Sequence, residues 1–376
     1  MKLLSALFLQ LIIFSATSIY SSDDYISLRL QTLSDNINLV QDLTIGDATS
    51  EVFFGNWPLK IAVGSQGRIF VADPQSYSLK AFSNKGGFIQ EIGREGRGPK
   101  EFGYLRSIDT GSEKNIYVMD SNDRISTFDE ESLELINDLN VPRFNVRWSP
   151  HEMKVAPEGF IIVYNKSFVA GEKNQERSNT ISFIDKQGNF IYEEYSNVKA
   201  DQLFVMDTGS SLWRTDMPFG GKSYLELGND GIIYFGWSKD TNIVKHSLDK
   251  KHNDTVNISY TPIEVTSEDL EDVLEYPPTS RQGKALREDA QISQYFPVYD
   301  WFVVDDKNRM WIAINTEDRE NYSLHIYDKD GELLDNTSLP KSVQLQVVRD
   351  GYAYGVQETE DGIQTVVRYK VNRLNG

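Results

Sequence analysis

Gly67-Arg68-Ile69-Phe70-Val71 is a short apolar stretch introduced by a turn residue, and its pattern occurs six times along the chain. The other copies are Lys114-Asn115-Ile116-Tyr117-Val118, Gly159-Phe160-Ile161-Ile162-Val163, Gly231-Ile232-Ile233-Tyr234-Phe235, Asn308-Arg309-Met310-Trp311-Ile312 and Asp350-Gly351-Tyr352-Ala353-Tyr354. Their third residues lie at 69, 116, 161, 233, 310 and 352, with spacings of 47, 45, 72, 77 and 42. Three spacings match the ~40–50 residues of a four-stranded propeller blade. The repeat predicts an all-β protein of six similar units.

Each copy lies within a longer series of apolar stretches. Residues 59–63 precede the first copy and residues 79–82 follow it. In three units a polar turn ending in glycine then leads to a fourth stretch, at residues 83–86, 185–188 and 328–331. Glycine supplies the positive φ angle that such hairpin turns need. We therefore expect each unit to be a four-stranded antiparallel meander.

The two ends of the chain complement each other. The last unit ends at Tyr369-Lys370-Val371 after three strands, and a β-like stretch between residues 26 and 43 precedes the first unit. If this stretch supplies the missing outer strand, it closes the ring and covers a sheet edge. The expected fold is a six-bladed β-propeller of four-stranded antiparallel blades, closed by an N-terminal strand, with residues 23–376 as one domain.

The two long spacings indicate insertions at about residues 197–224 and 261–299. Both lie between an outer strand and the next inner strand, so we expect them on one face of the ring. The first insertion carries Trp213 and Arg214. In the second, residues 267–274 are typical of a short amphipathic helix capped by Ser267. Together the insertions suit a ligand or peptide pocket, although they equally suit simple packing over the ring.

A glycine-rich segment points to a known repeat. Gly93-Arg94-Glu95-Gly96-Arg97-Gly98-Pro99-Lys100-Glu101-Phe102 is followed by a strand ending in Asp120 and by Asn122-Asp123-Arg124-Ile125. This pattern resembles an NHL repeat, and the whole chain is similar to uncharacterised secreted bacterial six-bladed β-propeller proteins. The resemblance implies the fold but no single activity, because NHL-like propellers include protein-binding modules and related propellers include metal-dependent lactonases and lyases.

The composition restricts the setting and the partners. Residues 1–22 are typical of a secretory signal peptide, with Lys2 before an apolar run that is too short to span a bilayer. The chain contains no cysteine, so disulfides and thiolate sites are excluded. We expect an exported bacterial protein, periplasmic or extracellular, with no transmembrane segment in the mature chain. The net charge of −18 argues against nucleic-acid binding.

The residues indicate no catalytic set. The four histidines lie in no triad or zinc motif, and His246 and His325 fall in third-strand positions. Asp73 and Asp120 occupy equivalent positions, where a shared turn-stabilising role is favoured over calcium binding. The inner strands are expected to be largely apolar, with acids such as Asp109 only at their ends.

We interpret the chain as a binding protein, not an enzyme, with no cofactor, that holds a ligand, peptide, glycan or protein on the insertion-bearing face. Aromatic and arginine residues in the inter-blade links are the candidate ligand-binding residues. These are Arg94, Arg97, Arg147, Trp148, Trp213, Arg214, Asp300 and Trp301. The alternative is a lactonase-like metal-dependent hydrolase or lyase with one divalent cation, such as calcium, in the channel.

Overall fold

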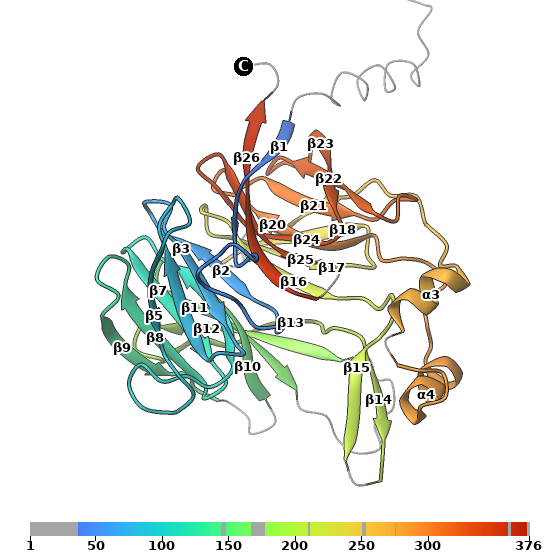
Figure 1. Cartoon of the computed structure of the whole chain (residues 1–376), viewed down its shortest axis with the longest axis horizontal. Coiled ribbons are helices and arrows are strands. Elements are labelled where there is room, and N and C mark those ends of the chain that lie inside the picture. Colours follow the sequence, from blue (N-terminus) through green and yellow to red (C-terminus); the bar gives the residue numbers. More distant parts are fainter. Residues whose placement is uncertain are drawn as a thin grey trace, which may run out of the picture.

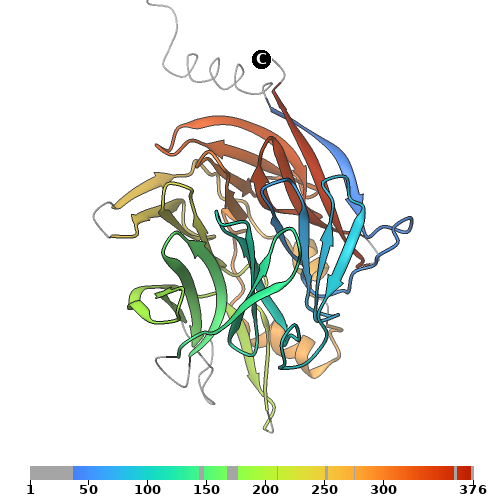
Figure 2. The same cartoon turned by 90° about the vertical axis from the view of Figure 1, so that its left-hand side faces the viewer.

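The computed structural model describes residues 37–143, 148–166, 177–209, 211–249, 253–274, 276–359 and 362–373. Six four-stranded antiparallel sheets follow one another around a ring, so the predicted all-β six-bladed propeller is confirmed (Figures 1 and 2). The six repeated stretches form the second strand of the six blades, as expected. The predicted signal peptide lies outside the described residues.

The first three blades are consecutive meanders. Blade one consists of β2 (Lys60–Val63), β3 (Ile69–Asp73), β4 (Ser78–Phe82) and β5 (Phe88–Ile92). Blade two consists of β6 (Leu105–Thr110), β7 (Asn115–Asp120), β8 (Arg124–Asp129) and β9 (Leu135–Asn140). Blade three consists of β10 (Trp148–Ala156), β11 (Gly159–Lys166), β12 (Ser178–Asp185) and β13 (Phe190–Lys199).

The last three blades include the one that closes the ring. Blade four consists of β16 (Ser223–Leu227), β17 (Ile232–Trp237), β18 (Asn242–Ser247) and β19 (Asn253–Asn257). Blade five consists of β20 (Tyr299–Val304), β21 (Met310–Ile314), β22 (Asn321–Tyr327) and β23 (Leu333–Pro340). Blade six consists of β24 (Val343–Arg349), β25 (Tyr352–Glu358), β26 (Gln364–Arg373) and β1 (Ile37–Ile45).

The N-terminal strand closes the ring as predicted. β1 pairs antiparallel with β26, from Ile37 opposite Arg373 to Ile45 opposite Val366 (Figure 1). Arg368 on β26 makes a bidentate ion pair with Asp42, with both N–O distances at 2.9 Å. The pairing covers the outer edge of the last blade, so the ends of the described chain hold each other in place.

The hydrophobic core is divided among the blade interfaces. Six clusters of buried side chains each join two neighbouring blades, and the cluster between blades six and one contains Ile45, Ile61 and Tyr354. Neighbouring blades cover both faces of each sheet, so apolar residues can follow one another in a strand without alternating with polar ones. This explains the continuous apolar runs of the repeat, such as β3, in which every residue is buried.

Turn residues behave as the sequence indicates. The hairpin glycines Gly86, Gly188 and Gly331 have φ angles of +83°, +87° and +88°. Asp73 accepts the backbone N–H groups of two following residues, and Asp120 accepts that of Asn122 at 2.9 Å. Each aspartate thus stabilises the turn of its own blade.

The glycine-rich segment is a link between blades one and two. The Glu101 carboxylate accepts the N–H groups of Arg97 and Gly98 at 3.1 and 2.8 Å and pairs with Arg94 at 2.7 Å. These hydrogen bonds lower the pKa of Glu101, and the one from the Gly98 N–H has the largest effect. Because an internal carboxylate fills the loop, its N–H groups serve the link and not an external phosphate. Phe102 is fully buried beneath it.

The two insertions pack against each other beside the ring. The first forms the hairpin of β14 (Leu203–Asp207) and β15 (Leu212–Asp216), and the second forms helices α3 (Ser267–Val273) and α4 (Arg281–Asp289) (Figure 1). They share a small core that includes Phe204 and Leu286. The predicted serine cap of α3 is wrong by one residue. The cap is Thr266, whose hydroxyl accepts the N–H of Asp269 in a capping box.

None of the helices in the described ranges combines the length and apolar character that crossing a membrane requires.

Two glycines with positive φ angles, one in a link and one in a hairpin turn, allow a test of the packing. A Cβ at Gly93 (φ +111°) would lie 2.5 Å from the Phe102 ring and 2.8 Å from the Tyr77 carbonyl, whereas one at Gly351 (φ +80°) meets nothing within 4 Å. We expect Gly351→Ala to lower the free energy of unfolding by about 1 kcal/mol through its φ angle alone. Gly93→Ala should cost roughly 2 kcal/mol more, because a buried ring and a backbone must move.

Chemical denaturation of both variants measures this difference. Equal destabilisation by the two substitutions would contradict the close packing of Phe102 against the link.

Candidate functional site

A cavity of about 690 Å³ runs through the centre of the ring. The inner strands β2, β6, β10, β16, β20 and β24 all contribute to its wall. Since the inner strands all run in the same direction, their first residues surround the mouth on the insertion-bearing face. The volume is within the range typical of small-molecule sites.

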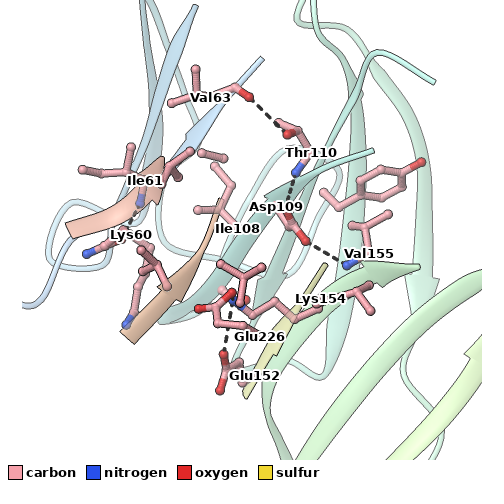
Figure 3. A pocket seen from close by; sticks show the side chains of 18 of the residues that line it. Lys60, Ile61, Val63, Ile108, Asp109, Thr110, Glu152, Lys154, Val155 and Glu226 are labelled. Atoms are coloured by element: carbon pink, nitrogen blue, oxygen red, sulfur yellow. Dashed lines mark hydrogen bonds and ion pairs between the residues drawn. The ribbon is translucent and has the colours of Figure 1, made fainter. Parts of the chain in front are cut away.

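Part of the polar lining satisfies the backbone of the inner strands. One edge of each inner strand faces the cavity and has no neighbouring strand. Gln346 of β24 accepts the N–H of Ile61 and donates to the carbonyl of Leu59, both at 2.9 Å. Asp109 of β6 accepts the N–H of Val155 at 2.8 Å (Figure 3). These side chains replace a missing strand, so their polarity has a structural cause.

A charged cluster lies deeper in the cavity. The Lys154 ammonium on β10 donates to Glu226 on β16 at 2.8 Å and lies 3.8 Å from Glu152 (Figure 3). Asp109 is close enough to contribute to its electrostatic environment. We call Asp109, Glu152, Lys154 and Glu226 the channel cluster. It places three carboxylates around one ammonium.

Burial and charge oppose each other in this cluster. Burial alone would lower the pKa of Lys154, but the charges of Glu226, Glu152 and Asp109 outweigh it and raise the pKa. Burial raises the pKa of Glu226 to about 7, against the lowering effect of Lys154, and also raises the pKa of Asp109. Lys154 therefore remains protonated at neutral pH, and the raised pKa values of Glu226 and Asp109 favour an additional proton on these two carboxylates.

Lys60 on β2 is a second cation in the cavity. Its ammonium has no acidic oxygen within 4.0 Å and no hydrogen bond to the described residues. The side chain is exposed to solvent in the channel, and protein surrounds the channel. These surroundings lower the pKa of Lys60, and the charge of Glu152 opposes this effect. Lys60 is thus a charged group that the fold leaves without a partner.

Two exposed aromatic side chains lie in the links that lead into β2 and β6. Trp57 and Tyr104 come from different inter-blade links and have ring centroids 5.3 Å apart. They are 43% and 37% exposed, so a large part of each side chain remains in contact with solvent. Tyr104 and Lys60 both line the cavity. Neither aromatic residue was selected from the sequence.

The residues that the sequence selected are spread over the insertion-bearing face. Of those described, only Trp301 lines the central cavity. Arg94 is 80% exposed, Arg97 is exposed, and Trp148 is half-buried at the start of β10. Asp300 accepts hydrogen bonds from Asn315 and Tyr322 at 2.8 and 2.7 Å. Arg147 lies outside the described residues.

Trp213 and Arg214 belong to the hairpin of the first insertion. Trp213 packs edge to face against Tyr276 of the second insertion, with centroids 5.1 Å apart, and Arg214 is exposed. Neither lines the cavity. The role of the selected residues in ligand binding stays a prediction, and the central cavity gives a different set of candidates.

The expectation of largely apolar inner strands is wrong for two blades. Glu152 and Lys154 lie in the middle of β10, and Glu226 lies between Leu225 and Leu227 in β16. The sequence does contain a pattern that indicates these residues, the polar side chains around the apolar Met153 in His151-Glu152-Met153-Lys154. In the structure Met153 is buried and its polar neighbours are not. Strands β2 and β20, on which the expectation relied, are the more apolar ones.

The donor set for a divalent cation is limited. Within the described ranges, no three histidine or carboxylate side chains converge as a set that suits a metal ion. In the channel cluster, where three carboxylates approach, the Lys154 ammonium occupies their common neighbourhood. A fixed cation at that position opposes a second one through like-charge repulsion.

Comparisons with known proteins agree with the fold. Residues 50–211 match the model of the DUF5128 family, described as a 6-bladed beta-propeller. A Bacteroides fragilis protein described as exported is similar over 90% of this chain and 95% of its own, with 13% identity and a TM-score of 0.51. A DUF4221 family member from Bacteroides vulgatus is similar over 90% and 99%, with 12% identity and a TM-score of 0.51. No curated protein matches the chain.

The channel cluster predicts a specific pH dependence. Because the folded state holds a proton on Glu226 up to about pH 7, whereas an exposed glutamate releases it near 4.5, stability falls as the pH rises between these values. We expect Glu226→Gln to remove on the order of 2 kcal/mol of this decline between about pH 5 and pH 8.

Urea unfolding across this pH range measures the free energy of unfolding. Glu332→Gln, an exposed change in a β22–β23 turn, is the control and should follow the unmodified protein. A decline of the same size in the Glu226→Gln variant would refute the assignment.

Proposed function

We propose that this propeller is an exported binding protein that holds a small polar ligand in its central channel, entered from the insertion-bearing face. The observation that carries the proposal is the 690 Å³ cavity, whose wall combines all six inner strands with charged groups of both signs. A pocket of this size with a few convergent polar groups is the usual form of a ligand site.

The charges in the channel support binding because the fold does not require all of them. Gln346 and Asp109 complete the edges of inner strands. Among the residues that the structure describes, Lys60 makes no such contact, and Glu152 has only the 3.8 Å approach of Lys154. Lys60 is exposed to the channel and Glu152 is only partly buried, so each charge is accessible to a polar ligand that supplies the missing interaction.

The alternative is a metal-dependent hydrolase or lyase. Lys154 argues against it, because its ammonium already neutralises part of the charge that would attract a cation. A cofactor-free binding site therefore accounts better for this arrangement. The proposed setting outside the cytoplasm is supported by the signal-like residues 1–22, by the absence of cysteine and by the similarity to a protein described as exported.

A plug at the mouth tests the binding site. Gln344 is the exposed second residue of β24, lines the cavity and makes no side-chain hydrogen bond among the described residues. We expect Gln344→Trp to reduce the affinity for any channel ligand at least tenfold by filling the entrance, with little change in stability. Ligand-detected NMR with a library of small polar compounds measures binding.

Gln90→Trp, an exposed change on the outer strand β5, is the matched control and should bind as the unmodified protein does. A ligand that binds the Gln344→Trp variant with unchanged affinity would show that its site lies outside the channel.

Replacement of the central cation tests the metal alternative. We expect calcium, manganese and zinc to leave the melting temperature of the metal-stripped protein unchanged, since Lys154 opposes their binding. In Lys154→Met the three carboxylates lose their counterion, so manganese should raise the melting temperature in a saturable manner. Lys222→Met, outside the cavity wall, is the control. A saturable rise in the unmodified protein would favour the hydrolase alternative over our proposal.

A further inference from the structure

Lys60 and the aromatic pair at the mouth specify the ligand further. On the basis of the proposed channel site, we infer that the ligand carries a carboxylate and a flat ring, and that Lys60 binds the carboxylate while Trp57 and Tyr104 contact the ring. The three residues lie on the same side of the mouth, because Trp57 precedes β2 and Tyr104 precedes β6, its neighbour in the ring.

The ammonium of Lys60 determines the charge of the ligand group. Lys154, the other lysine in this part of the cavity, already has Glu226 at 2.8 Å. Lys60 has no comparable partner, and the carboxylates that influence it, led by Glu152, lie beyond ion-pair distance. A ligand carboxylate at Lys60 would form a charge-assisted hydrogen bond, which is stronger than one between neutral groups.

The aromatic pair determines the shape of the rest of the ligand. The two rings lie 5.3 Å apart, are tilted by 45°, and are 43% and 37% exposed. A planar or ring-shaped group that covers them removes apolar surface from water. Trp57 lies three positions before Lys60, which corresponds to at most about 10 Å along the backbone. The ring and the carboxylate of the ligand should be separated by a similar distance.

Other charges at the mouth make the inference testable. Asp201 and Glu152 also line the cavity, and they favour a cationic ligand. Arg106 is less available, because it approaches Asp123 at 3.5 Å and donates to the carbonyl of Pro150. The preference between a carboxylate and an amine therefore depends on whether Lys60 or the acids dominate.

Three probes with one ring and different head groups separate these cases. They are 1-pyrenebutyrate, its primary amide and 4-(1-pyrenyl)butylamine, whose binding is followed by fluorescence anisotropy at neutral pH. We expect the carboxylate to bind at least fivefold more tightly than the amide, and the amine to bind most weakly. Trp57→Ala should weaken all three probes to a similar extent.

Variants of Lys60 show whether this residue sets the preference. In Lys60→Met the carboxylate and the amide should bind equally, and Lys60→Arg should restore the preference because it keeps the charge. Lys370→Met, an exposed change on β26, is the matched control and should leave the preference intact.

The outcomes distinguish this inference from the proposed function. The channel site stands if Gln344→Trp abolishes binding of all probes. The carboxylate inference is then overturned if the unmodified protein binds the amine best, or if the Lys60→Met variant keeps the preference for the carboxylate. If Gln344→Trp leaves probe binding unchanged, the channel site itself is refuted.

Discussion

The free edge of each inner strand is the constraint on which this channel depends. Six strands turn unpaired N–H and C=O groups toward the axis, and buried backbone groups need partners. Polar side chains of the neighbouring inner strand supply several of them. The carbonyl of Val63, for example, accepts hydrogen bonds from Thr110 of β6 at 3.2 Å and from Arg349 of β24 at 2.7 Å. The ring is thus joined at its centre by side-chain hydrogen bonds and between its blades by apolar contacts.

This constraint changes how a polar channel is interpreted. A polar residue on the axis of a propeller is not by itself a sign of a ligand, because the backbone edges already require such residues. Gln346 and Asp109 are explained in this way, and Asp305 is likewise occupied by Arg309 and Trp311 at 2.6 and 2.9 Å. Lys60 is different, since nothing in the described fold uses its charge. A polar group that already has a partner in the protein is therefore weak evidence for a ligand, whereas a charged group without one is stronger evidence.

The architecture was predictable from the sequence because its signals are local and repeated. Ile69, Ile116 and their equivalents each mark a second strand, and Gly86 and its equivalents each mark a hairpin. The site was not predictable to the same degree. Lys154 and Glu226 lie 72 residues apart in the sequence and meet only because β10 and β16 face the same axis. The selected arginine and tryptophan residues lie in links that are spread around the ring, and of those described only Trp301 lines the cavity.

The position of Lys154 also shows how one propeller scaffold can support different chemistry. Carboxylates from several blades converge on the axis, and the balance of charge there depends on what lies between them. A divalent ion would bring two positive charges and an open coordination position, whereas an ammonium brings one charge and saturates its neighbours through hydrogen bonds. With Glu226 at 2.8 Å, Lys154 directly compensates one of the three carboxylates of this centre. Under the proposed function, ligand binding then depends on the charges outside this pair, which are the ammonium of Lys60 near the mouth and the carboxylate of Glu152.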